Sequence, residues 1–137
     1  MEGIMDYFAY ASNLSREQMR KLCPDAKPKF SAILPNYKLI FSGWSREWHG
    51  GTATIQSFRG AKVVGAVYEI SEKDLQKLDR FEGYPNNYTH VNVMVFNEDD
   101  VAVKAITYIK TRQAEETKPA PEYVAIIRQG LKDWELE

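Results

Sequence analysis

Apolar and polar residues alternate along much of the chain, a pattern that predicts β-strands. Short, β-prone apolar runs occupy residues 6–11, 30–34, 37–41, 52–58 and 63–70. Turn residues stand between neighbouring runs, with Pro35-Asn36 predicting one tight turn and Arg59-Gly60 another. Residues 88–96 and 101–110 alternate around the acidic turn at residues 97–100, which predicts a hairpin.

Three other segments have the apolar spacing of amphipathic helices. Ser15 to Gln18 carries a capping-box pattern, in which the serine hydroxyl binds the amide three residues on and Gln18 reaches back. Ser71 to Asp74 is a second such start, and Gly83 stops the helix that follows it. Pro121 suits the first turn of a final helix. Its apolar stripe consists of Tyr123, Ile126, Ile127, Leu131 and Trp134.

Strands therefore outnumber helices, and the helices lie at different points in the strand series. The pattern predicts an α+β fold, with a small mixed, curved β-sheet or barrel and flanking helices. A length of 137 residues fits a single domain over residues 1–137. The stretch GWSREWHGG at residues 43–51 is predicted to be a loop. Its exposed aromatics, Trp44 and Trp48, fit either a homodimer contact or a cavity wall.

Composition narrows the classes of partner. The formal net charge is -1. Binding to nucleic acid or to anionic lipid needs a basic surface, so the charge argues against both kinds of partner. The sequence has no uninterrupted apolar stretch of about 18 residues, so no membrane span is expected. The acidic N-terminus does not resemble a signal peptide, and a single cysteine, Cys23, cannot form an internal disulfide. Both features predict a cytoplasmic protein.

Metal and nucleotide chemistry find little support in the sequence. His49 and His90 are the two histidines, and their spacing is not that of a zinc site. Cys23 precedes a proline at a helix end, with no nearby group that would lower its pKa. The phosphate-binding string Gly-x-x-x-x-Gly-Lys-Ser/Thr is absent. We therefore expect neither metal nor cofactor.

Two segments could carry chemistry. Glu82 lies one turn past Leu78 at the end of its predicted helix, and partial burial there would raise its pKa toward that of a useful base. An exposed helix-end glutamate is the alternative. In YFAYASNL, residues 7–14, a strand runs into a helix start whose free amides could bind an anion, with Ser12 and Asn13 as added donors. Simple helix capping by Asn13 or Ser15 uses the same amides.

These two segments, with three others, resemble the γ-glutamylcyclotransferase family. YFAYASNL closely resembles the family motif YFAYGSNL. Further similar segments follow in the family order: WHGGTATI from residue 48, VVGAVYEIS from 63, LDRFEGYPNNY from 78 and PAPEYVAIIRQGLK from 119. The resemblance covers nearly the whole chain.

The resemblance implies a small mixed β-barrel with a cavity at its mouth. The loop Tyr10, Ala11, Ser12, Asn13 and Leu14 would hold a γ-glutamyl group, Glu82 would be the general acid/base, and Tyr88 and Tyr123 would line the cavity. The implied reaction releases 5-oxoproline from a small-molecule γ-glutamyl amino acid or amine. Two alternatives stay open: removal of a γ-glutamyl cap from a biosynthetic intermediate, or a non-catalytic binding module on the same fold.

Ala11 departs from the family motif, which has glycine at this position. An alanine with positive φ would be strained, whereas a negative φ only narrows the pocket by a methyl group. We predict a negative φ at Ala11, because Asn13 adopts the left-handed conformation more easily than alanine does.

Overall fold

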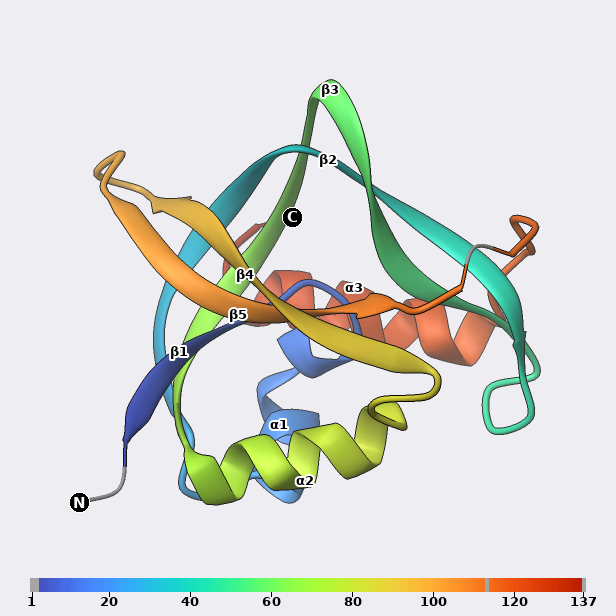
Figure 1. Cartoon of the computed structure of the whole chain (residues 1–137), viewed down its shortest axis with the longest axis horizontal. Helices are drawn as coiled ribbons and strands as arrows, with labels where there is room; N and C mark the ends of the chain where they lie inside the picture. The colour runs from blue at the N-terminus through green and yellow to red at the C-terminus, as the bar shows by residue number, and fades with distance from the viewer. Residues whose placement is uncertain (1–2, 113, 137) are drawn as a thin grey trace.

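A computed structural model of the chain describes residues 3–112 and 114–136, which form a strand-rich barrel with three α-helices (Figure 1). Its elements are β1 (Ile4–Ala9), the 3-10 turn η1 (Ser12–Leu14), α1 (Arg16–Leu22), β2 (Lys27–Ser45), β3 (Gly50–Ser71), α2 (Glu72–Glu82), β4 (Tyr88–Asn97), β5 (Ala102–Lys110) and α3 (Pro121–Asp133). The predicted α+β class is confirmed.

The five strands close into a barrel in the order β1-β3-β2-β4-β5. Neighbours pair antiparallel except at the closure, where β1 runs parallel to β5 with Tyr7 opposite Ile106. Closure through one parallel pair makes the sheet mixed, as predicted. It also leaves no strand edge free along this seam.

Two predicted turns are wrong. β2 and β3 each continue through the places where the sequence predicted a break, at Pro35-Asn36 and at Arg59-Gly60. The register between the two strands shifts between Pro35 and Tyr37, with Asn36 at φ 64°. Because the two strands pair on both sides of this irregularity, it bends them and does not end them. The strands also extend into the predicted loop at residues 43–51, leaving a turn at residues 46–49.

The helix starts follow the sequence closely, with one difference. Ser71 and Asp74 form a complete capping box at the start of α2. Ser15 accepts the Gln18 backbone N–H, but the Gln18 side chain does not return to the Ser15 amide. Its Nε2 donates to Asn13 Oδ1 instead.

None of the helices in the described part of the chain combines the length and the apolar composition of a membrane span.

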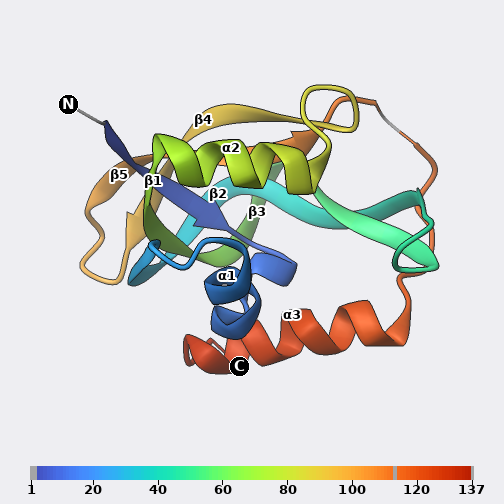
Figure 2. The same ribbon diagram turned by 90° about the horizontal axis from the view of Figure 1, so that it is seen from below.

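The core has two parts, one on each face of the barrel wall. Successive residues of β1 alternate between them, as strand geometry requires. Phe8 lies in the interior cluster, as does Tyr10 just after the strand, and Tyr7 and Ala9 lie in the cluster beneath the helices. Figure 2 shows α2 along one side of the barrel and α1 above α3 on another. Helix α3 packs against η1, where Gly130 leaves room for Leu14.

Candidate active site

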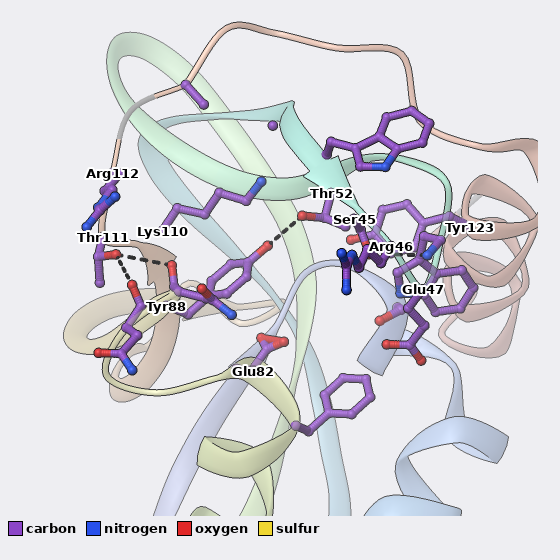
Figure 3. A pocket seen from close by; sticks show the side chains of 18 residues that line it. Ser45, Arg46, Glu47, Thr52, Glu82, Tyr88, Lys110, Thr111, Arg112 and Tyr123 are labelled. Carbon is purple, nitrogen blue, oxygen red and sulfur yellow. Dashed lines mark hydrogen bonds between the residues drawn. The ribbon is translucent and has the colours of Figure 1, made fainter.

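Glu82 is the last residue of α2 and projects into a cavity at the barrel mouth (Figure 3). Gly83 ends the helix in the left-handed conformation, with φ 73°. A side chain at Gly83 would also meet Asn87. The turn thus needs glycine, and it fixes where the helix stops and where the Glu82 carboxylate lies.

The cavity has an outer and an inner part. The outer part has a volume of about 620 Å³, and its wall includes Trp44 and Trp48. The inner part is much smaller, about 30 Å³. We call it the inner chamber. Its wall comprises Tyr7, Tyr10, Ala11, Ser12, Asn13, Ala53, Glu82, Tyr88, Tyr108 and Tyr123. Ser12, Glu82, Tyr88 and Tyr123 line both parts, so the two spaces meet at these four residues.

Burial raises the pKa of the Glu82 carboxyl to about 7. In residues 3–112 and 114–136, no group makes a hydrogen bond or ion pair with this carboxylate. The negative end of the α2 dipole also disfavours a charge there. A carboxyl that titrates near neutral pH can both accept and return a proton, as general acid–base catalysis requires.

The two tyrosines expected in the cavity wall are held by the backbone of Ala53. The Tyr88 hydroxyl donates to Ala53 O at 2.7 Å, and the Ala53 N–H donates to the Tyr123 hydroxyl at 2.9 Å. Trp48 lies against Tyr123, with ring centroids 5.0 Å apart. One residue of β3 therefore positions both phenol groups beside Glu82.

The structure places four of the five predicted loop residues in the inner chamber. Ala11 has φ -129°, so the prediction of a negative φ is confirmed. The reason given for it is wrong, because Asn13 lies in η1 and is not among the residues with positive φ. Leu14 does not line the cavity. Its side chain is fully buried in the cluster beneath the helices, where α3 passes over it.

Several cavity residues were not predicted from the sequence. Tyr7 and Tyr108 line the inner chamber, while Arg46, Lys110 and Arg112 line the outer part. Lys110 donates to Ser42 O at 2.6 Å, and burial lowers its pKa. Nothing in the sequence marks Tyr7 as a cavity residue, because strand alternation assigns it to the core as readily as to a cavity.

That the chain needs no metal stays a prediction. In the described part of the chain, no three His, Cys, Asp or Glu side chains converge to hold a metal ion. Cys23 is buried beneath α2, and burial raises the pKa of its thiol to about 12. A thiol in that state is a poor nucleophile.

The closed barrel, with a cavity at its mouth and a carboxyl of raised pKa in the cavity wall, defines a small α+β enzyme. Sequence comparison gives the family. The model of the family described as "Gamma-glutamyl cyclotransferase, AIG2-like" matches residues 7–134, and the chain belongs to this family.

Relatives agree in sequence and in structure. The chain is 34% identical to human and 33% identical to bovine "Gamma-glutamylcyclotransferase" in alignments 132 positions long, which cover 93% of this chain and 70% of each relative. A solved "Gamma-glutamyl cyclotransferase" superposes with a TM-score of 0.93 at 32% identity, over 98% of this chain and 82% of that one. The predicted resemblance is confirmed.

Proposed function

We propose that this chain is a γ-glutamyl cyclotransferase that releases 5-oxoproline from γ-glutamyl amino acids or amines, with Glu82 as the general acid/base. The observation that carries the proposal is the Glu82 carboxyl, which lines both parts of the cavity, has its pKa raised to about 7 and has no partner among the described residues. The family and its relatives support the reaction type.

The chemistry needs one proton carrier and a folded substrate. The substrate's α-amine attacks its own γ-carbonyl carbon, so a new C–N bond closes a five-membered ring while the amide C–N bond breaks. That amine is mostly an ammonium near neutral pH, so its nitrogen loses two protons in becoming the lactam N–H. Glu82 takes these protons in turn and passes each to the departing nitrogen, which leaves as an ammonium. Ring closure is intramolecular, and well-oriented cases of this kind gain about 7–11 kcal/mol.

The two parts of the cavity suggest how the substrate lies. The inner chamber has room for only a few atoms, so it takes one end of the glutamyl group. Backbone N–H groups of the loop at residues 10–13, with the Ser12 hydroxyl, would bind that end. The leaving group would lie in the outer part, which is large enough for an amino acid or a longer amine. Tyr88 and Tyr123 stand at the junction.

Incubation with γ-glutamyl-alanine, with detection of 5-oxoproline, tests the proposal. Glu82→Gln keeps the shape of the side chain but cannot exchange protons, so we expect turnover to fall by about 10²-fold or more. Equal turnover by wild type and variant would contradict the role of Glu82. No turnover across a panel of γ-glutamyl amides, together with tight binding of one of them, would favour a binding module.

The panel also separates the two kinds of cyclotransferase. Turnover of a single γ-glutamyl compound, with simple amino acids rejected as leaving groups, would favour removal of a cap from a biosynthetic intermediate. We further infer that one domain over residues 1–137 carries the activity. A cytoplasmic location and a homodimer stay predictions, which fractionation and sedimentation would test.

A further inference from the structure

Five tyrosines line the inner chamber, and they differ in whether the hydroxyl donates its proton to a protein acceptor. Tyr10, Tyr88 and Tyr108 donate theirs to protein oxygens: Tyr108 O, Ala53 O and Asp79 Oδ1. Tyr7 and Tyr123 instead accept an N–H from the protein. In the described residues neither of these two donates its own proton, so both protons are available to a bound molecule.

Tyr7 is oriented by a chain of two amide side chains. Gln18 Nε2 donates to Asn13 Oδ1 at 3.0 Å, which leaves Asn13 Nδ2 facing Tyr7. Asn13 Nδ2 then donates to the Tyr7 hydroxyl, also at 3.0 Å. The Asn13 amide faces Tyr7 with a donor and cannot take the Tyr7 proton in this orientation. Asn13 and Tyr7 are 4% and 3% exposed, so bulk water does not compete for it.

The surroundings of Tyr7 favour donation of its proton to a molecule bound beside Glu82. Tyr7 and Glu82 line the same inner chamber. Burial, followed by the negative charge of Glu82, raises the pKa of Tyr7 well above its ordinary value. The phenol therefore stays protonated at neutral pH. No hydrogen bond joins it to Glu82, so a substrate oxygen seated beside Glu82 is the acceptor that the chamber offers.

We propose that Tyr7 is a catalytic hydrogen-bond donor to the γ-carbonyl oxygen of the substrate, and that Asn13 and Gln18 are positioning residues that aim it. The inference rests on the proposed cyclotransferase function. When the α-amine attacks, the carbonyl π electrons move onto oxygen, and the Tyr7 O–H stabilises the anion. When the amide C–N bond breaks, the carbonyl re-forms, and Tyr7 keeps its proton throughout.

Tyr7→Phe tests the donor, with Tyr68→Phe as the matched control. Tyr68 is a buried tyrosine of the same core cluster, but its hydroxyl faces Leu14 O at 3.4 Å and not the chamber. We expect Tyr7→Phe to lower kcat by about 10²-fold with KM nearly unchanged, because the bond strengthens only as the oxyanion forms. Unchanged kcat, a rise in KM alone, or an equal loss in Tyr68→Phe would overturn the proposal.

Two substitutions at Gln18 test the aiming without touching the cavity. Gln18→Lys can only donate, so it preserves the orientation of Asn13. Gln18→Glu can only accept when ionised, so it turns Asn13 Oδ1 toward Tyr7 and captures the proton. Glutamate at this third helical position is favourable for α1, so a loss of kcat would not come from unfolding.

We expect Gln18→Glu to lower kcat by about 10-fold or more and Gln18→Lys to keep it, with KM similar in both. The reverse order, or equal kcat in the two variants, would overturn the aiming role. Failure of the proposed function looks different, because the wild type itself would then release no 5-oxoproline from any γ-glutamyl amide. An active wild type with an unaffected Tyr7→Phe variant would contradict the Tyr7 inference alone.

Discussion

Glu82 makes the folded protein less stable as pH rises, and Glu82→Gln should reveal this. The pKa of the carboxyl is raised from 4.5 to about 7 in the folded state. Between these two values the folded protein keeps a proton that the unfolded chain has already lost. The free energy of unfolding therefore falls as pH increases through this interval. Glutamine cannot ionise, so the free energy of unfolding of the variant does not fall for this reason.

The size of the effect follows from the pKa shift. A change from 4.5 to about 7 is roughly 2.5 pKa units, which corresponds to about 3 kcal/mol at 1.36 kcal/mol per unit. Below pH 4.5 both states are protonated and the contribution vanishes. Above about pH 7 both states are ionised and the full destabilisation of about 3 kcal/mol is present. The slope between the limits is about 1.4 kcal/mol per pH unit.

Urea denaturation of wild type and Glu82→Gln at intervals from about pH 4 to about pH 9 measures this difference. All other titrating groups are shared and cancel in the difference between the two proteins. A constant cost of burying the amide offsets that difference equally at every pH, so it cancels in the change of the difference with pH. We expect the variant to gain about 3 kcal/mol relative to wild type across the range. A difference independent of pH, or one that moves in favour of wild type as pH rises, would refute the assignment of a raised pKa to Glu82.

Three further results are expected. The kcat/KM of the wild type should rise with pH to a plateau, with an apparent pKa near the value of about 7 for Glu82, and a limb near 4.5 would contradict this. Gly130→Ala should lower the free energy of unfolding by about 1–3 kcal/mol in urea denaturation, because the added Cβ would lie 2.6 Å from Ser15 N beside Leu14, and an unchanged value would contradict the close packing of α3 on η1. Ala11→Gly should keep 5-oxoproline release within a few-fold, because φ is already negative, and should lower stability by about 0.5–1 kcal/mol, whereas a gain in stability would contradict this.

Local signals in the sequence were sufficient for much of the fold. The capping box at Ser71 and Asp74 and the turn at residues 97–100 act over a few residues, and the structure has both where predicted. The breaks in β2 and β3 failed because pairing is not local. Pro35-Asn36 has the residues of a turn, yet each long strand has its partner on both sides of it, so the chain bends and continues.

The candidate site was predictable only in part, for a similar reason. The position of Glu82 follows from helical spacing and from the family motif. The surroundings of its carboxylate, however, are formed by residues from β3, β4, α3 and the loop after β1, which the sequence does not bring together. Tyr7 and Phe8 are adjacent and both aromatic, and only the closed barrel decides which one meets the cavity. The Gln18 contact to Asn13 likewise replaces the expected capping contact because η1 presents Asn13 to it.

Helix α2 shows how one short element separates structural from functional acids. Asp74 lies at its N-terminal end, where the Ser71 N–H and the positive end of the dipole stabilise a carboxylate. Glu82 lies at the other end, half-buried and without a hydrogen-bond or ion-pair partner in the part of the chain that the structure describes. Both the dipole and the loss of water oppose its charge there. Exchanging their surroundings would make Glu82 a stable anion and a weaker base. The helix therefore carries its destabilising carboxyl at the end where the proposed chemistry uses it.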